Sequence, residues 1–241
     1  DLLFLTGRDW KFLPKSLNGQ KVINILQSLE QCEPEHPAFR YLKRPAYRIC
    51  VSPAIKQAIA PYKNGESAVI NYGIPLDIFA PSPQKKSGSI AIWGRKNPEL
   101  ADELHRALAD RGVSAQLLID YLPRTDFAGI LAKTDILVAL SQFPEGFYLP
   151  ALEGMASGCA VVCADAIGNR GFCLHEQTCL MPAYGDCAEH VAMIERLLAD
   201  SALKEKIRQG GREMAATFTM DSERENFYRF LQQHGLTEAH A

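Results

Sequence analysis

Two glutamates, Glu145 and Glu153, lie eight residues apart in the segment PEGFYLPALEGMASG, which spans residues 144–158. A helix is expected to begin at Pro150, because proline suits the first helical position, where its missing N–H costs no hydrogen bond. The N–H groups of a first helical turn and the positive end of the helix dipole together form a site for phosphate. The dipole alone explains one glutamate near this helix start, but it does not explain the EGFYLP stretch before the helix.

The two carboxylates fit a ligand that carries a hydroxylated sugar on each side of a diphosphate, and a nucleotide-sugar is such a ligand. Glu153, one turn into the expected helix, would accept hydrogen bonds from ribose hydroxyls. Glu145 would reach past the phosphates to the attached group, and Gly146 would let the backbone approach closely. The alternative is that the glutamates only complement the helix dipole.

Positive charge for a diphosphate is available after another expected strand. Arg95 and Lys96 directly follow the apolar stretch 89–94, and the loop that contains Glu145 follows the apolar stretch 135–141. The carboxyl ends of parallel strands meet at the edge of the sheet where ligands bind. Arginine can hold a phosphate with two parallel hydrogen bonds. The alternative for this Arg-Lys pair is a solvated turn.

Strands alternate with amphipathic helices from residue 89 onward, which predicts a parallel sheet covered on both faces. Strands are expected over 89–94, 114–119, 135–141, 160–165 and 178–182. Helices are expected over 97–112, over 125–134 with Thr125 or Asp126 as the cap, from Pro150, and over 185–200. Asp186 and Glu189 stand at capping-box spacing at the start of the last helix.

The first 80 or so residues are expected to be the tail half of an α/β domain, since complete domains typically have about 100–150 residues. Strands are expected over 21–30 and 67–74, and a strand followed by a helix over 47–62. The stretch APSPQKKSGS (80–89) has linker composition. Near the end, Ser222 and Glu225 form a possible capping box, and the last helix presents an apolar face of Phe227, Phe230 and Leu231.

Composition is that of a soluble globular protein: 47% of the 241 residues are hydrophobic, 22% are charged, and the net charge is −2. This charge gives no support to a nucleic-acid partner, and no apolar run approaches the ~20 residues of a membrane span. The seven cysteines form no CxxC pair, so free, buried thiols of a reducing compartment are expected. The first residues, without Met or signal-peptide order, suggest the inside of a longer protein.

The segment LSQFPEGFYLPALEGMASGCAVVCAD resembles the signature of retaining GT-B glycosyltransferases of the family 4 type, in which two glutamates are separated by seven residues. YRICVSPAIKQAI and SAVINYGIPLDIFAP are similar to the end of the family's first domain, and IAIWGR to its Gly-Arg strand. TCLMPAYGDCAEHVAMIERLLAD is similar to a later family segment. The resemblance covers nearly the whole chain and is most specific over 135–200.

The resemblance implies an α/β protein of GT-B fold with Rossmann-like, doubly wound parallel sheets. Residues 1–82 would be the C-terminal part of the acceptor-side domain. Residues 83–218 would be the complete donor-binding domain, and residues 219–241 a C-terminal helix that packs back across the hinge.

Site residues follow from the resemblance position by position. Glu145 would be catalytic and lie near the hydroxyls of the donor sugar, while Gly146 and Phe147 would line its pocket. The main chain around Tyr148 and Leu149 would meet the phosphates. The family usually has glycine where this chain has Tyr148, and this difference would narrow the approach of the phosphates or mark a subgroup.

The remaining site residues would hold the nucleotide. Glu153 would bind the ribose, and Arg95, as a second catalytic residue, would neutralise the leaving diphosphate together with Lys96. The family's lysine generally lies several residues later, so Lys96 departs from the pattern. His175, before the expected strand 178–182, is a further candidate to face the same edge.

The implied reaction is transfer of a sugar with retained configuration from a nucleotide-diphosphate donor, with UDP, GDP or dTDP as the nucleotide. No cofactor or metal is expected, and the sequence has no DxD pair. The acceptor would be a glycan or a lipid-linked molecule in surface polysaccharide synthesis, in the cytoplasm or at the inner face of the membrane with peripheral contact. Two alternatives remain: a non-catalytic nucleotide-sugar-binding module and a GT-B-like sugar-nucleotide epimerase, against which the spacing of the two glutamates argues.

Overall fold

The computed structural model describes residues 2–17, 19–83 and 87–236, and its chain divides into two compact units. The first unit contains the residues up to Gly73, the segment Pro144–Phe147 and the residues from Met220 onward. The second unit contains Ile74–Phe143 and Tyr148–Thr219. Residues 74–80 thus group with the second unit, and residues 84–86 of the expected linker lie outside the described residues.

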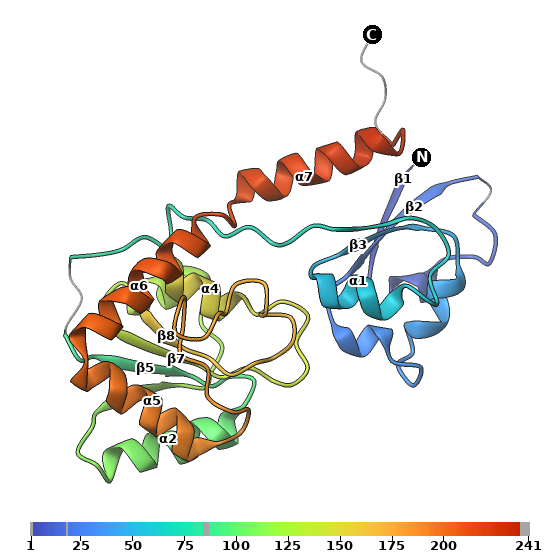
Figure 1. The fold of residues 1–241 in the computed structure, drawn as a ribbon. Coiled ribbons are helices and arrows are strands. Elements are labelled where there is room, and N and C mark those ends of the chain that lie inside the picture. The colour runs from blue at the N-terminus through green and yellow to red at the C-terminus, as the bar shows by residue number, and fades with distance from the viewer. Residues whose placement is uncertain (1, 18, 84–86, 237–241) are drawn as a thin grey trace. The chain divides into compact units, whose positions relative to one another are not determined.

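The second unit is built on a parallel sheet of four strands in the order β6-β5-β7-β8 (Figure 1). The strands are β5 (Ile90–Trp93), β6 (Ala115–Leu118), β7 (Ile136–Ala139) and β8 (Ala160–Val162). The helices are α2 (Pro98–Ala109), α3 (Arg124–Leu131), α4 (Leu149–Ala156), α5 (Cys187–Ala199) and α6 (Ser201–Ala215). Figure 1 shows α4 on one side of this sheet and α2 and α5 on the other, as expected for a doubly wound sheet.

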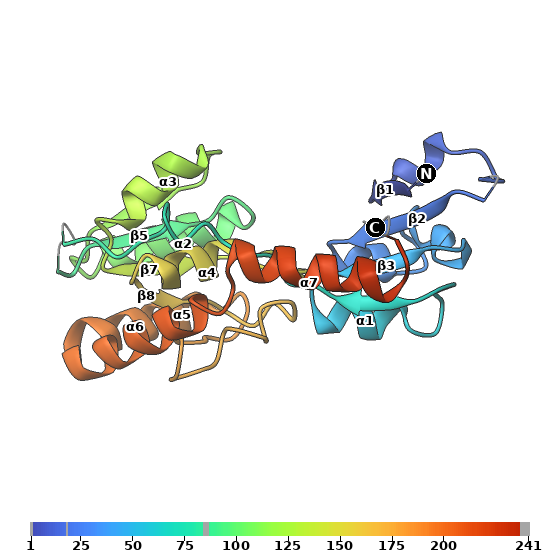
Figure 2. The same cartoon turned by 90° about the horizontal axis from the view of Figure 1, so that it is seen from above.

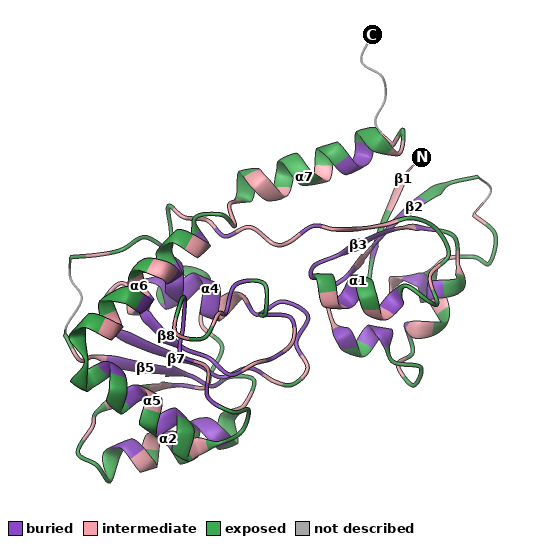
Figure 3. Ribbon diagram, in the orientation of Figure 1, coloured by how far each residue is buried: buried purple, intermediate pink, exposed green. Residues whose placement is uncertain are grey.

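Hydrophobic burial explains why these segments form strands. Every residue of β5, β7 and β8 is buried (Figure 3), which is typical of strands covered on both faces. Side chains from these strands pack with α2 and α5 through Leu104, Leu108, Val191 and Ile194. The strands are parallel, so their carboxyl ends, and the loops that follow them, share one edge of the sheet.

Three local expectations for the second unit are wrong. Residues 178–182 form no extended strand but two isolated bridges, one between Leu180 and Val162 of β8 and one between Cys179 and His175. Helix α3 begins at Arg124 with Pro123 in the cap position, so neither Thr125 nor Asp126 caps it. The capping box of α5 is only half formed: Asp186 accepts from the N–H of Glu189, but the Glu189 carboxylate accepts from the N–H of Ala183 instead.

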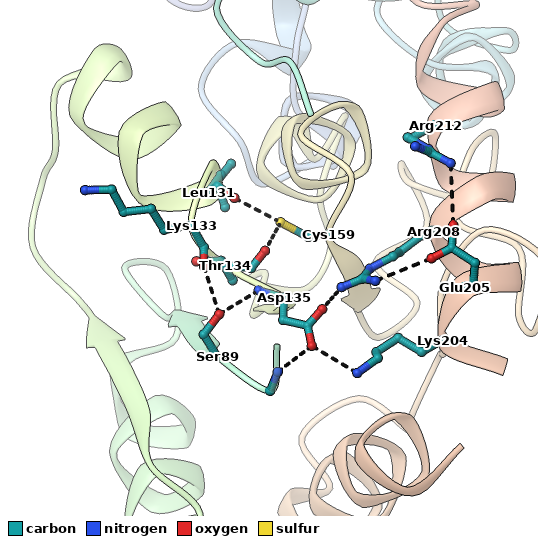
Figure 4. Close-up of polar contacts among 11 residues, drawn as sticks. Ser89, Leu131, Lys133, Thr134, Asp135, Cys159, Lys204, Glu205, Arg208 and Arg212 are labelled. Atoms are coloured by element: carbon teal, nitrogen blue, oxygen red, sulfur yellow. Dashed lines mark hydrogen bonds and ion pairs between the residues drawn. The ribbon is translucent and has the colours of Figure 1, made fainter. Parts of the chain in front are cut away.

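Helix α6, which was not expected from the sequence, is tied to the amino edge of the sheet by a buried carboxylate (Figure 4). Asp135 precedes β7 and accepts from the N–H of Gly88 at 2.6 Å and from Lys204 Nζ at 3.0 Å. Arg208 forms an ion pair with the same carboxylate. Gly210 lets α6 approach closely, because a Cβ there would overlap the carbonyl oxygen of Gln177.

The first unit has its own parallel sheet in the order β1-β2-β3-β4. Its strands are β1 (Leu2–Thr6), β2 (Lys21–Leu26), β3 (Tyr47–Cys50) and β4 (Ser67–Val69). Its helices are α1 (Pro53–Ile59), α7 (Met220–Gln233) and the 3-10 helices η1 (Asp9–Phe12), η2 (Leu29–Cys32) and η3 (Phe39–Lys43). Helices α1 and α7 cover opposite faces of this sheet (Figure 1).

The C-terminal half of α7 lies across β2 and β3 (Figure 2) and packs there through Phe230 and Leu231. Phe227 is partly buried against the same cluster, so the expected apolar face of this helix is confirmed. Ser222 is not a cap, because α7 begins two residues earlier, at Met220. Within the described residues, no helix has the length and apolarity needed to cross a bilayer. Six cysteines are buried and Cys187 is half-buried, all as free thiols.

Candidate functional site

The carboxyl edge of the second sheet gathers most of the residues that the sequence singles out. Arg95 and Lys96 follow β5, and the loop that leads to α4 and Glu153 follows β7. Strands β5 and β7 are neighbours in the sheet, so these two segments leave adjacent strands at the same edge. This edge is where doubly wound sheets bind their ligands.

Helix α4 presents an open N-terminus at this edge. It begins at Leu149, one residue before the expected start, with Pro150 in its first turn and Tyr148 in the cap position. In the part of the chain that the structure describes, no side chain caps this end, and the first turn holds no acidic residue. The first-turn N–H groups and the positive end of the dipole therefore favour an anion.

Tyr148 does not narrow the approach to this helix with its side chain. Its ring is fully buried, and its hydroxyl donates to the carbonyl oxygen of Leu140, just after β7, at 2.8 Å. Lys96 Nζ lies 5.9 Å from the centroid of the ring, so the ammonium group is close to the residue in the cap position of α4. The tyrosine that stands where the family usually has glycine therefore packs in the protein core, and the ammonium group of Lys96 lies beside its ring.

Arg95 lies against an aromatic ring that the sequence reasoning missed. Its guanidinium is 5.2 Å from the ring centroid of Tyr121, within the range of a cation–π interaction. Tyr121 is 71% exposed, which is unusual for so large a side chain, and it lies in the segment between β6 and α3. Strand β6 lies next to β5 on the side away from β7. The ring of Tyr121 and the guanidinium of Arg95 therefore lie at the part of the carboxyl edge that is farther from α4.

Glu153 is a buried carboxylate with little electrostatic support. It is 7% exposed on α4, and burial raises its pKa to about 7, while the charge of Arg124 acts in the opposite direction. Arg124 Nε lies 4.0 Å from Glu153 Oε1, which is an ion-pair distance but not that of a hydrogen bond. A carboxylate in this state gains from any ligand that donates hydrogen bonds to it.

Glu145, Gly146 and Phe147 group with the first unit, unlike Tyr148 and Leu149. Glu145 is 5% exposed. Gly146 packs so closely on the segment after β2 that a Cβ there would overlap the carbonyl oxygen of Gln27. The ring of Phe147 meets that of Tyr72 edge-on, with centroids 5.9 Å apart. The structure therefore divides the predicted site residues between the two units.

Tyr121 and Arg124 lie at this edge, and sequence reasoning missed both of them. Both belong to the stretch that follows β6, so the rule that ligands meet the carboxyl ends of strands could have found them. His175, by contrast, has a structural role: its Nδ1 accepts from the N–H of Met181 at 3.0 Å, and its Nε2 lies 3.9 Å from the carboxylate of Glu176.

Comparison with known sequences gives a family and a relative. The sequence model of the family described as glycosyl transferases group 1 matches residues 76–200. The lipopolysaccharide core biosynthesis glycosyltransferase LpsE of Rhizobium meliloti (strain 1021) is 29% identical over 131 residues. This match covers 52% of the chain and 36% of the relative, so the chain aligns with about a third of that protein.

Comparison with solved structures gives the fold. Sucrose-phosphate synthase from Thermosynechococcus elongatus superposes with a TM-score of 0.78 at 17% identity, over 97% of this chain and 73% of that one. HepE from Anabaena, in complex with UDP-glucose, gives a TM-score of 0.73 at 17% identity, over 89% and 72% of the two chains. Together with the two parallel sheets, these likenesses confirm the expected α/β fold of GT-B type.

Proposed function

Because the chain belongs to the glycosyl transferases group 1 family, we propose that it binds a nucleotide-sugar and supplies the donor site of a glycosyltransferase. One observation carries this proposal: the open N-terminus of α4 has a cation, Lys96, beside the ring of its cap residue Tyr148, and a buried carboxylate, Glu153, one turn into the helix. A diphosphate matches the helix end and the cation. The ribose hydroxyls match the carboxylate, because they donate hydrogen bonds, whereas the nearest cation in the part of the chain that the structure describes, Arg124, lies 4.0 Å away.

Tyr121 and Arg95 extend this donor site toward the nucleobase. The exposed ring of Tyr121 offers a flat apolar surface, and stacking of a base on an aromatic side chain contributes about 1–3 kcal/mol. Arg95 contacts this ring and can also reach toward the diphosphate. The base would then lie at the end of the site near β6 and the phosphates near α4.

Catalysis in this proposal rests on charge. The bond between the sugar's anomeric carbon and the diphosphate oxygen breaks, a bond from that carbon to an acceptor hydroxyl oxygen forms, and the proton of that hydroxyl passes to the leaving diphosphate oxygen. Negative charge grows on the leaving diphosphate, where Arg95, Lys96 and the N–H groups of α4 stabilise it. Glu145 would lie beside the hydroxyls of the donor sugar, in a pocket lined by Gly146 and Phe147. The configuration at the anomeric carbon would be retained.

For the acceptor we propose a glycan or a lipid-linked molecule in surface polysaccharide synthesis, reached in the cytoplasm or by peripheral contact with the membrane. The relative LpsE, named for lipopolysaccharide core biosynthesis, supports this choice. A non-catalytic binding module and a sugar-nucleotide epimerase are the two competing functions. An epimerase would alter the free nucleotide-sugar without any acceptor, whereas a binding module would turn over nothing.

Calorimetric titration of the chain with UDP, GDP and dTDP tests the donor site directly. The UDP-glucose held by HepE makes UDP the first ligand to measure. At pH 8, where Glu153 is ionised, we expect one nucleotide to bind and Glu153→Ala to weaken it by roughly 10- to 100-fold, since a hydrogen bond to a charged group contributes about 1.5–3 kcal/mol.

Glu195→Ala is the matched control, because Glu195 is a half-exposed glutamate of α5 in the same unit and pairs with Arg111. Its nucleotide affinity should equal that of the unmodified chain. Equal losses in the two variants, or a folded chain that binds none of the three nucleotides, would contradict the proposal. Transfer activity then separates enzyme from binding module: Glu145→Gln should abolish transfer and leave most of the nucleotide affinity.

A further inference from the structure

A second concave site lies within the first unit, between its sheet and α7. The cavity has a volume of about 230 Å³. Its floor is formed by aliphatic side chains of neighbouring strands, namely Ile25, Ile49, Val51 and Ile70. Ile25 and Ile49 are register partners in β2 and β3, and Val51, two residues after Ile49, lies on the same face. The floor is therefore a continuous aliphatic surface.

The cavity exists because α7 covers only part of this surface. Phe230 and Leu231 pack tightly on the sheet, and Phe227, one turn earlier, forms a wall of the cavity. One turn further toward the start of the helix, at the spacing where another apolar side chain would continue the stripe, the chain has Glu223 and Arg224. These polar residues do not fill the space above the isoleucines.

Glu223 and Arg224 are held at the lip of the cavity by other groups. Glu223 Oε2 accepts from the N–H of Gly73 at 2.8 Å, and Arg224 Nη1 lies 2.9 Å from Asp221 Oδ1. Tyr72 completes the lip. The lip thus offers hydrogen-bond donors and acceptors above an apolar floor. The two charged residues that line the cavity, the carboxylate of Glu223 and the guanidinium of Arg224, balance each other, so a head group without net charge matches them.

We infer that this cavity binds the alkyl chain of an amphiphile whose head is uncharged and hydroxylated, as in an alkyl glycoside. The volume exceeds that of an engineered apolar cavity of about 150 Å³, which stays dry and takes up benzene. Each methylene that enters contributes about 0.8 kcal/mol through burial, which corresponds to about a fourfold gain in affinity. Hydroxyl groups of the head can donate to Glu223 and accept from Arg224.

The experiment is a titration of isoleucine-methyl-labelled protein with n-octyl β-D-glucopyranoside below its critical micelle concentration, followed by NMR. We expect saturable shifts of the Ile25, Ile49 and Ile70 methyl signals. Affinity should rise about fourfold for each methylene added from the hexyl to the octyl glycoside. Glucose alone should not shift these signals. Absence of a saturable shift, or equal shifts with glucose, overturns the inference.

Matched variants locate the binding. Ile25→Phe fills part of the floor and should weaken octyl glucoside binding by about 16-fold, which corresponds to the loss of contact with about two methylenes. Leu2→Phe makes a similar change against the same hydrophobic cluster but outside the cavity, and it should have no effect. Met220→Asp places a charge on an exposed part of the wall, so it should also weaken binding without disturbing the core.

Equal affinities in Ile25→Phe, Met220→Asp and Leu2→Phe would overturn the inference. Nucleotide affinity should be the same in all three variants, because none of them touches the residues of the donor site. A failure of nucleotide binding would therefore count against the proposed function and leave the alkyl site standing, and the reverse holds for a failure of octyl glucoside binding.

Discussion

Two buried carboxylates of the second unit differ in how many donors surround them. Asp135, at the amino edge of the sheet, accepts from the N–H of Gly88 and from Lys204, and it pairs with Arg208 (Figure 4). Glu153, in the helix that follows β7 at the other edge, has Arg124 at 4.0 Å as its closest charged partner among the described residues. Its pKa is raised to about 7 by burial.

This difference shows that burial alone does not identify a carboxylate that binds a ligand. Asp135 is surrounded by donors of its own chain, and its role is to tie α6 and the start of β5 to the amino edge. Glu153 is buried, and the residues that the structure describes give it no equivalent set of donors, so its ionised form costs free energy in the folded state. Sites that bind ligands retain such groups, because the ligand supplies the missing hydrogen bonds.

The comparison predicts that removing Asp135 has the largest effect on stability. Asp135→Ala leaves Lys204 and Arg208 without their carboxylate in a largely buried place, and breaking such a cluster typically costs about 3–5 kcal/mol. Urea unfolding measures this loss. Glu205→Ala is the control, because Glu205 pairs with Arg208 and Arg212 in the same cluster but is 60% exposed, so its loss should cost no more than about 1 kcal/mol.

Equal destabilisation by Asp135→Ala and Glu205→Ala would contradict this prediction, because it would mean that a buried carboxylate contributes no more to stability than an exposed one. Nucleotide affinity gives a second readout. Asp135 lies at the edge opposite to the donor site, so Asp135→Ala should bind nucleotide as tightly as the unmodified chain under conditions where it remains folded.

The second prediction concerns Glu153, whose contribution to the free energy of unfolding should depend on pH. Its pKa is about 7 in the folded state and 4.5 as the ordinary value, so the folded state binds the proton more tightly. This contribution to stability is complete below pH 4.5 and is lost as the pH rises to about 7, at 1.36 kcal/mol per pKa unit, or up to about 3 kcal/mol. Glu153→Gln stays neutral and should not lose it.

The free energy of unfolding of Glu153→Gln relative to the unmodified chain should therefore increase between pH 4.5 and pH 7 and stay constant above that. Urea unfolding at several pH values measures this difference, and all other titrating groups cancel because they are common to both proteins. A difference that does not vary with pH would mean that Glu153 has ordinary solvation, and the contrast with Asp135 would disappear.

Much of the second unit could be predicted from the sequence because its signals are local. The apolar runs that became β5, β7 and β8 are short and continuous, and Pro150 marks the start of α4 to within one residue. The parallel sheet follows from the strand–helix alternation, and with it the edge that carries Arg95 and Lys96. These features depend on residues that are close in sequence.

Features that depend on distant residues could not be predicted. Helix α6 was not expected, and the need for glycine at Gly210 is explained only by the nearby carbonyl of Gln177. Lys204 meets Asp135 across 69 residues, which no spacing rule indicates. Tyr148 could be interpreted as an obstacle to phosphate until the structure showed that its ring is buried and that its hydroxyl donates to the carbonyl oxygen of Leu140. The division of the loop at Phe147 and Tyr148 between two units is likewise a property of packing.

The smallest expected effect concerns Arg124, the charged partner nearest to Glu153 among the described residues. Arg124→Gln removes a charge that lowers the pKa of Glu153, so this pKa should rise further. The Arg124 side chain is 56% exposed, and pairs with an exposed partner contribute about 0.2–1 kcal/mol, which corresponds to less than about one pKa unit. NMR titration of the Glu153 side-chain carboxyl carbon measures the shift.

High salt should produce part of the same shift in the pKa of Glu153 in the unmodified chain, because salt screens the exposed guanidinium of Arg124. A pKa that falls, or that ignores both changes, would show that Glu153 has closer support than Arg124 provides, as Asp135 does.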